Sequence, residues 1–224
     1  MKQVCTLMVL LLGVGIALAQ SETRTATAPY SLKGFKLGES SLADFKAQFR
    51  HCADSCDAKS KYTPKFAPFC SDDFPESRQT PDHADSALPW TKSGLVFCQP
   101  YFPFERDKHF TIADVDTTAY FDFFNGKLYR ISAAFLNYGG TNFASMRDAF
   151  ISKFGPATKD DVVEYNNAFG VKFSGHVLTW DNGVSTIVLT EINQSKDTSA
   201  VVFSHKAILN AAGEAAPKKT THDL

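Results

Sequence analysis

The stretch of sequence that decides the fold runs from Thr117 to Leu136 and reads TTAYFDFFNGKLYRISAAFL. Two runs rich in aromatic and β-branched residues flank the dipeptide Asn125-Gly126, which is typical of the tight turn in a β-hairpin. Apolar residues alternate within each run, so each strand would present one apolar face. We therefore predict two antiparallel strands, over residues 117–124 and 127–136.

The register of this hairpin can be argued from its apolar residues. Phe121 and Phe123 form one set before the turn, and Tyr129 begins a second set that continues at 131, 133 and 135. A two-residue turn would pair residues 124 and 127 and place the sets on opposite faces. A three-residue loop over 124–126, with Gly126 left-handed in a G1 bulge, pairs Phe121 with Tyr129 and puts both sets on one face. We predict the bulged turn.

Two segments carry helical patterns. Ser41 and Asp44 form a capping box, and apolar residues recur at positions 42, 45, 49, 52 and 56. Asn142 is the predicted cap of a second helix, whose apolar residues at 143, 146, 150 and 154 lie on one face. Gly155 and Pro156 end that helix.

Further strand patterns complete the order helix, strands, helix, strands. They occupy residues 95–98, 162–165, 171–180, 184–191 and 200–206. This order indicates an α+β fold of two degenerate helix-plus-antiparallel-sheet units, over 34–138 and 139–209. Residues 20–33 are predicted to be flexible, and residues 210–224, poor in apolar bulk, to be a disordered tail. The helices would cover one sheet face and leave the other for solvent or a partner.

The beginning of the chain has the features of a signal peptide. Lys2 precedes an apolar run over 4–18, and Ala17-Leu18-Ala19 is a small-residue cleavage site, which predicts removal of residues 1–19. The run is shorter than the roughly 20 residues that a membrane-spanning helix needs. We expect a periplasmic or secreted protein with no transmembrane segment after cleavage. Losing Lys2 takes the formal net charge from −1 to about −2, which offers no basic footprint for nucleic acid.

Four cysteines follow the cleavage site, and an even number in an exported chain indicates two disulfides. Cys52 and Cys56 are four residues apart on a helical pattern, which places them poorly for a bridge to each other. We favour Cys52–Cys98 with Cys56–Cys70, ahead of the crossed alternative. A zinc site of four thiolates is the competing idea, but the spacing is loose for zinc and the compartment is oxidising.

A proline-rich, acidic insert over 57–91 separates the first helix from the first strand, and Cys70 would pin it. An aromatic cluster follows, with a basic residue beside it, and this composition is typical of interface hot spots. The candidate binding residues are Trp90, Tyr101, Phe102, Phe104 and Arg106. The alternative is that these aromatic residues close the core over Cys98. The sequence contains no established catalytic, metal-binding or nucleotide-binding motif, so we expect no cofactor and no metal.

Three segments together carry a resemblance to a known kind of protein. They are Gly34–Ser40 (GFKLGES), Phe124–Ile131 (FNGKLYRI) and Ala149–Pro156 (AFISKFGP). They resemble small exported bacterial proteins, namely the β-lactamase inhibitory protein and the outer-membrane assembly lipoproteins that share its helix-and-sheet repeat. The resemblance implies that fold, and it implies non-enzymatic protein binding through the open sheet face and its loops. Unlike the lipoproteins, this chain has no lipobox cysteine.

We therefore expect a non-enzymatic exported binding module that recognises an envelope or extracellular protein through the open sheet face and the 57–108 region. One alternative is an exported hydrolase that uses the acidic loop around His83, where Asp82 and Asp85 place carboxylates beside an imidazole. Another is a carbohydrate-binding module that uses Trp90 and Tyr101.

Overall fold

The structure is a computed structural model of the 224-residue chain. It describes residues 27–49, 69–73, 90–100, 110–166, 170–193 and 197–216. The predicted signal peptide and most of the 57–91 insert lie outside these residues.

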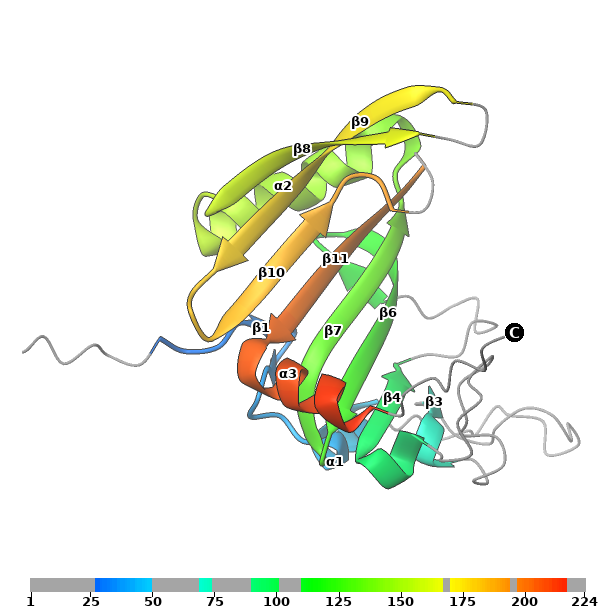
Figure 1. The fold of residues 1–224 in the computed structure, drawn as a ribbon, viewed down its shortest axis with the longest axis vertical. Helices are drawn as coiled ribbons and strands as arrows, with labels where there is room; N and C mark the ends of the chain where they lie inside the picture. Colours follow the sequence, from blue (N-terminus) through cyan, green and yellow to red (C-terminus); the bar gives the residue numbers. More distant parts are fainter. Residues whose placement is uncertain are drawn as a thin grey trace, which may run out of the picture.

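Nine strands of the described chain form one antiparallel sheet (Figure 1). Their order is β3-β4-β6-β7-β11-β10-β9-β8, and β5 pairs with β6. The strands are β3 (Phe69–Cys70), β4 (Leu95–Gln99), β5 (Phe110–Ile112), β6 (Val115–Phe124), β7 (Lys127–Leu136), β8 (Lys159–Asn166), β9 (Lys172–Asp181), β10 (Ser185–Thr190) and β11 (Thr198–His205). Each strand pattern that the sequence predicted between residues 95 and 206 corresponds to one of them.

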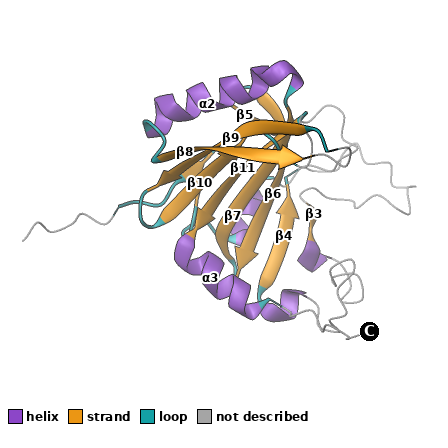
Figure 2. Cartoon of the chain, turned by 45° about the horizontal axis from the view of Figure 1, so that its top comes forward, coloured by secondary structure: helices purple, strands orange, loops and turns teal. Residues whose placement is uncertain are grey.

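Helices lie on both faces of this sheet. The α-helices are α1 (Leu42–Gln48), α2 (Thr141–Phe154) and α3 (Lys206–Ala215), and the 3-10 turns are η1 (Ser71–Asp73), η3 (Trp90–Ser93) and η4 (Tyr138–Gly140). A small hairpin of β1 (Ser31–Leu32) and β2 (Phe35–Lys36) precedes α1. Figure 2 shows α2 and α3 on opposite faces of the sheet. The α+β class predicted from the sequence is confirmed.

The two halves of the chain have similar connectivity. Helix α1 is followed by β3, β4, β5, β6 and β7, and α2 is followed by β8, β9, β10 and β11. Apart from β5, which has no counterpart in the second half, the strands of each set are adjacent in the sheet in chain order. The last strands of the two sets, β7 and β11, pair antiparallel at the centre of the sheet. The sequence predicted two helix-plus-antiparallel-sheet units, and the structure joins the strands of both halves in one sheet. The likeness to the β-lactamase inhibitory protein stays a prediction.

The β6–β7 hairpin corrects the predicted register. Phe124 pairs with Lys127, so the turn has two residues, and Asn125 and Gly126 have φ of 49° and 76°. Positive φ at both central residues is the type I′ geometry that Asn-Gly favours. The pairing of Phe121 with Tyr129 was wrong, because the register shifts between Asp122 and Phe123 and Phe121 pairs with Ile131. The bulge lies in the strand, and it turns Tyr129 to the opposite face.

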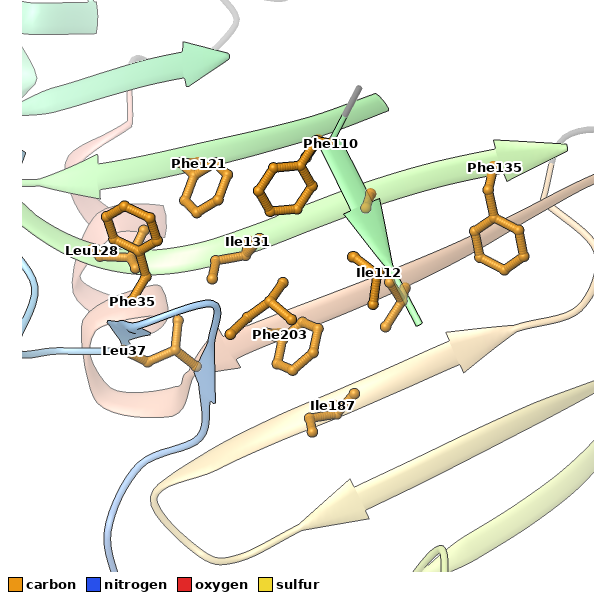
Figure 3. Packing of buried hydrophobic residues seen from close by; sticks show 14 of the residues in the cluster. Phe35, Leu37, Phe110, Ile112, Phe121, Leu128, Ile131, Phe135, Ile187 and Phe203 are labelled. Carbon is orange, nitrogen blue, oxygen red and sulfur yellow. The ribbon is translucent and has the colours of Figure 1, made fainter. Parts of the chain in front are cut away.

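The main core lies between one face of the sheet and helices α1 and α2. Phe45 of α1 and Phe35 of β2 meet Phe121 of β6, with ring centroids 4.8 and 5.2 Å from it. Phe150 of α2 lies 5.8 Å from Phe203 of β11. Figure 3 shows Phe35, Phe121 and Phe203 in this single apolar layer. Aromatic pairs at these separations add to the stability that burial provides.

Helix α1 begins as predicted. The Ser41 hydroxyl accepts a hydrogen bond from the Asp44 N–H at 3.1 Å, and the Asp44 carboxylate accepts one from the Ser41 N–H at 3.0 Å. The cap predicted for α2 was wrong, because Asn142 is its second residue and Gly140 takes the cap position. Asn137, which precedes the helix, supplies the missing acceptor, and its side chain accepts from the Phe143 N–H at 2.9 Å.

Helix α3 corrects the predicted disordered tail, because residues 206–215 are helical. Its side chains Ile208, Leu209 and Ala212 pack on a small apolar cluster with Leu95 and Tyr129 on the second face of the sheet. Tyr129 reaches this face because of the β7 bulge. The few apolar residues of this segment are therefore packed against the second face of the sheet, and this tertiary contact stabilises the helix.

The predicted flexible segment over 20–33 is ordered in its described part. Leu32 of β1 is buried, and the Tyr30 N–H donates to the Ser185 hydroxyl at 2.9 Å. The Tyr30 ring also lies 5.2 Å from Phe154. These long-range contacts, invisible in a polar sequence, fix residues 30–32 against the second half of the chain.

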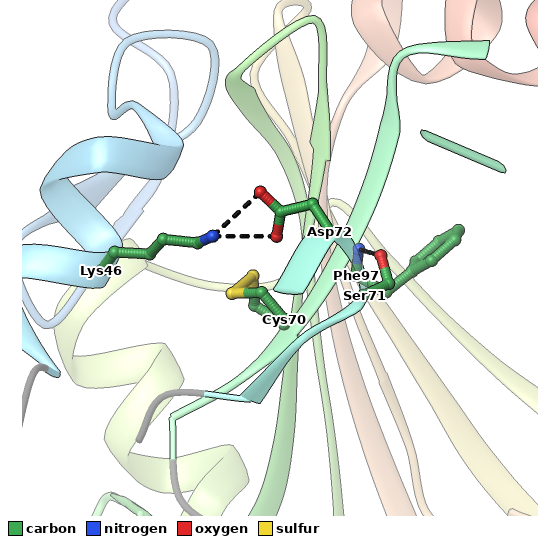
Figure 4. The surroundings of a disulfide bond; sticks show 6 residues. Lys46, Cys70, Ser71, Asp72 and Phe97 are labelled. Atoms are coloured by element: carbon green, nitrogen blue, oxygen red, sulfur yellow. Dashed lines mark hydrogen bonds and ion pairs between the residues drawn. A yellow bond between two sulfur atoms is a disulfide. The ribbon is translucent and has the colours of Figure 1, made fainter. Parts of the chain in front are cut away.

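A disulfide joins Cys70 of β3 to Cys98 of β4, which are directly opposite each other with Cα atoms 4.1 Å apart. Figure 4 shows the Lys46 ammonium beside it, 2.9 Å from the Asp72 carboxylate. The predicted pairings Cys52–Cys98 and Cys56–Cys70 were wrong, because the strand pairing of β3 brings Cys70 to Cys98. Cys52 and Cys56 themselves lie outside the described residues.

Candidate functional site

The aromatic cluster predicted as a binding site lies mostly beyond the described part of the chain. Tyr101, Phe102, Phe104 and Arg106 are outside it, and Trp90 is described as the first residue of η3. His83 and its acidic neighbours are also outside. The structure therefore brings none of these side chains to a described site, and their roles stay predictions.

The second predicted element of the site, the sheet face away from α1 and α2, is described. Side chains of five neighbouring strands alternate between this face and the core, so that Ile187, Val201 and Phe203 point to the core and their neighbours point outward. We call twelve uncharged members of this outward set the open face. They are Thr118, Tyr120, Ser132, Ala134, Leu136, Val177, Thr179, Thr186, Val188, Thr190, Ala200 and Val202. Charged Asp116, Arg130 and Asp181 lie on the same side of the sheet at the border of this set.

The pairing of the strands aligns these side chains in rows. Tyr120 pairs with Ser132, Ser132 with Val202, Val202 with Val188, and Val188 with Thr179. This row crosses β6, β7, β11, β10 and β9 without a bulge. The packed core behind the row supports these five strands, so a partner would meet an ordered surface.

The open face is uncharged and accessible. All twelve of its side chains are at least partly exposed, and the largest, Tyr120 and Leu136, are 40% and 49% exposed. β-Branched Val and Thr favour strands and give a flat surface when they point outward together. An uncharged surface with exposed tyrosine and leucine has the composition of the centre of a protein interface, where charged residues are depleted.

An ion pair marks the end of the open face next to α3. Asp181 at the end of β9 bonds to the ammonium of Lys206, the first residue of α3, at 2.6 Å. This bond from Lys206 and a second from the Gly183 N–H hold the pKa of Asp181 below its usual range. The pair connects the start of α3 to the sheet, and Asp181 lies directly opposite Thr186 of the open face.

The carboxylate of Asp122 is buried near the same end of the open face, next to α3. Asp122 is 2% exposed and forms an ion pair with Arg130 across the β6–β7 hairpin. Burial raises the pKa of Asp122, and Arg130 opposes that rise. Burial, and then the nearby Asp122, raise the pKa of Tyr129 to about 12. Arg130 is 39% exposed, so it satisfies the buried carboxylate and also presents positive charge at the border of the open face.

Sequence reasoning missed this cluster, although a signal existed. Asp122 stands between Phe121 and Phe123 in an apolar strand, and a buried carboxylate requires a partner. Arg130 becomes that partner only because the bulge in β7 shifts the strand register, so that Arg130 lies opposite Asp122.

Other polar groups of the described chain do not converge on a reactive centre. His176 Nδ1 lies 2.8 Å from the Asp160 carboxylate, and both side chains are exposed. No group of three or more His, Cys, Asp or Glu side chains within the described ranges is arranged to hold a metal ion. A shallow hollow of about 400 Å³ beside α1 is lined by Ser41, Leu42, Ala43, Lys46, Asp72 and Gly126, and its two charged residues bond to each other.

Comparison with known proteins identifies no family for this chain. No family model matches it, and no curated protein does. It is similar to the solved structure of a DUF4309 family protein (YjgB) from Bacillus subtilis, with 10% identity and a TM-score of 0.30, over 79% of this chain and 86% of that one. Within the described ranges, no helix is both long and apolar enough to cross a membrane.

Proposed function

We propose that this protein is an exported, non-enzymatic binding module that recognises a protein of the cell envelope or the extracellular medium. The open face is the recognition surface, and the 57–108 region adds contacts beside it. The observation that carries the proposal is the uncharged, accessible row from Tyr120 to Thr179 on an ordered sheet. Such a surface provides apolar contact area at little cost in conformational entropy, which favours protein binding.

The export part of the proposal rests on two features. The predicted signal peptide directs the chain out of the cytoplasm, and the Cys70–Cys98 disulfide is a bond that persists in oxidising compartments.

The experiment that tests the proposal is cross-linking capture from envelope and medium fractions, with three forms of the protein compared. Val188→Lys places a charge at the centre of the open face, and Ile151→Lys places the same charge on α2, on the other side of the sheet, where Ile151 is 40% exposed. We expect the wild type and Ile151→Lys to capture one protein saturably. Val188→Lys should weaken that capture by about a hundredfold, since desolvating an unpaired charge in an interface costs several kcal/mol.

Trp90→Ala provides a separate arm for the 57–108 region, and there we expect a smaller loss. Equal capture by Val188→Lys and Ile151→Lys would contradict the role of the open face. The absence of saturable capture by the wild type would contradict protein binding altogether.

A further inference from the structure

Strand β8 is an exposed edge of the sheet. It follows β9 at the end of the strand order and pairs with β9 over eight consecutive residues, from Lys159 to Asn166 (Figure 2). The opposite end, β3, has two residues and is tied to β4 by the disulfide. A long, regular, proline-free edge is the kind of strand that can accept another strand.

The hydrogen bonds of β9 establish which backbone groups of β8 point outward. The His176 C=O accepts a hydrogen bond from the Glu191 N–H, so the backbone groups of His176 point toward β10. The Thr179 C=O accepts a hydrogen bond from the Thr158 N–H, so the backbone groups of Thr179 point toward β8. The N–H and C=O of one strand residue point the same way, and successive residues alternate. His176 pairs with Val162, so the N–H and C=O of Val162 point away from β9.

The same alternation applies to the residues two positions on either side. The outward backbone groups of β8 therefore include those of Asp160, Val162 and Glu164. No described residue hydrogen-bonds to these groups. They are three donors and three acceptors with the spacing that an added strand requires.

The side chains of this edge combine apolar and acidic character. Val162 and Val163 are 62% and 37% exposed, one on each face of the sheet. Asp160 and Glu164 flank Val162 on its face, two residues away on either side, and the exposed Asp160 carboxylate also contacts His176 Nδ1 at 2.8 Å. A strand seated on this edge would place its own side chains directly beside these three, where opposite charges attract and like charges repel.

We propose that the β8 edge binds an extended segment of a partner polypeptide as an additional strand of the sheet. The segment carries an apolar residue beside Val162 and basic residues beside Asp160 and Glu164, which is the sequence pattern basic-x-apolar-x-basic. A second copy of this chain fits poorly, because antiparallel pairing centred on Val162 places Asp160 opposite Glu164 of the other copy. The edge is separate from the open face, so this inference does not depend on the proposed function.

The probe is a capped, fluorescent heptapeptide, Thr-Lys-Thr-Val-Thr-Lys-Thr, with Thr-Glu-Thr-Val-Thr-Glu-Thr as its charge-reversed control, titrated into the protein by fluorescence anisotropy. The decisive variant is Val162→Pro, which removes an outward N–H and no bond to β9. Its matched control is Val162→Thr, which keeps the N–H and the β-branched shape. We expect Val162→Pro to weaken binding of the basic peptide by about tenfold and Val162→Thr to leave it nearly unchanged.

Two further measurements make the test independent of how well the proline variant folds. Saturating the wild type with the basic peptide should slow exchange of the Val162 amide hydrogen by about tenfold and leave Val163, already bonded to β9, unchanged. Glu164→Lys should abolish the preference between the two peptides, because one of the two acidic side chains then carries the opposite charge.

Several results would overturn the inference. They are absent binding of the basic peptide, equal binding of both peptides, equal affinity of Val162→Pro and Val162→Thr, or an unprotected Val162 amide. A dimer of the wild type that Val162→Pro dissociates in sedimentation would also overturn it, because the occupant would then be a second copy. Val188→Lys, on the open face, should bind the peptide normally, which separates failure at the edge from failure of the proposed function.

Discussion

Removing Arg130 is the most informative perturbation of the polar cluster beside the open face. In Arg130→Met the long aliphatic stem is roughly kept and the charge is lost, while the Asp122 carboxylate stays 2% exposed. Removing one partner of a buried ion pair destabilises proteins by about 3–5 kcal/mol, because an uncompensated charge remains. For Asp122 and Arg130, this range of energies can be narrowed by considering protonation of Asp122.

Protonation of Asp122 sets an upper limit on the cost. The folded variant can neutralise the carboxyl by binding a proton, and each pH unit above the ordinary pKa of 3.8 makes this about 1.4 kcal/mol more expensive. The limit is therefore about 4 kcal/mol at pH 7 and about 1.6 kcal/mol at pH 5. Above pH 3.8 the folded variant binds a proton at Asp122 that the unfolded chain has released. The free energy of unfolding of the variant therefore falls as the pH rises above 3.8.

The assay is urea unfolding followed by tryptophan fluorescence, at pH 5 and pH 7, with the disulfide intact. We expect Arg130→Met to lower the free energy of unfolding by up to about 4 kcal/mol at pH 7 and by less than about 2 kcal/mol at pH 5, because the pKa of Asp122 is already raised in the wild type. In the Asp122→Asn background the same substitution should cost less than about 1 kcal/mol, since no charge is left unpaired. A loss that is the same at both pH values, or the same in the two backgrounds, would refute the reasoning and assign the effect to packing of the arginine stem.

Three further predictions concern other contacts of the fold. Gly38→Ala should lower the free energy of unfolding by about 2–5 kcal/mol, because Gly38 has φ of 76° and a Cβ there would stand 2.6 Å from the His205 ring. Gly34→Ala, with φ of 87° and open space, should cost only about 1–2 kcal/mol, and equal losses would contradict the contact with His205. Ser41→Ala should cost about 1 kcal/mol through loss of the α1 cap, and urea unfolding of the variant checks it. Spectrophotometric titration should show one tyrosine with a pKa of about 12 that Tyr129→Phe removes. Because the folded pKa of Tyr129 is raised, its contribution to stability should be complete below pH 10 and lost as pH rises toward 12; a Tyr129→Phe titration identical to that of the wild type would contradict the assignment.

Local patterns in the sequence determined helices α1 and α2, seven of the strands and their order. The Ser41–Asp44 capping box, the apolar face of α2 with its stop at Gly155, and the alternation in the strands each lie within a few residues. Backbone geometry repeats over the same short distances, with a period of 3.6 residues in helices and 2 in strands. The α+β class followed from these patterns alone, whereas the prediction that helices cover only one face was wrong, because α3 packs on the second face.

The tertiary structure decided which elements meet, and with them the candidate surfaces. The bulge at Tyr129 pairs Asp122 with Arg130 and exposes an apolar surface for α3, and two-residue strand β3 brings Cys70 to Cys98. The β8 edge likewise exists because no described strand follows it in the sheet order. These outcomes depend on contacts between residues distant in sequence, and such contacts form where they bury the most apolar surface without leaving polar groups unpaired. That balance is a property of the whole packed chain, which is why no single stretch of sequence contains it.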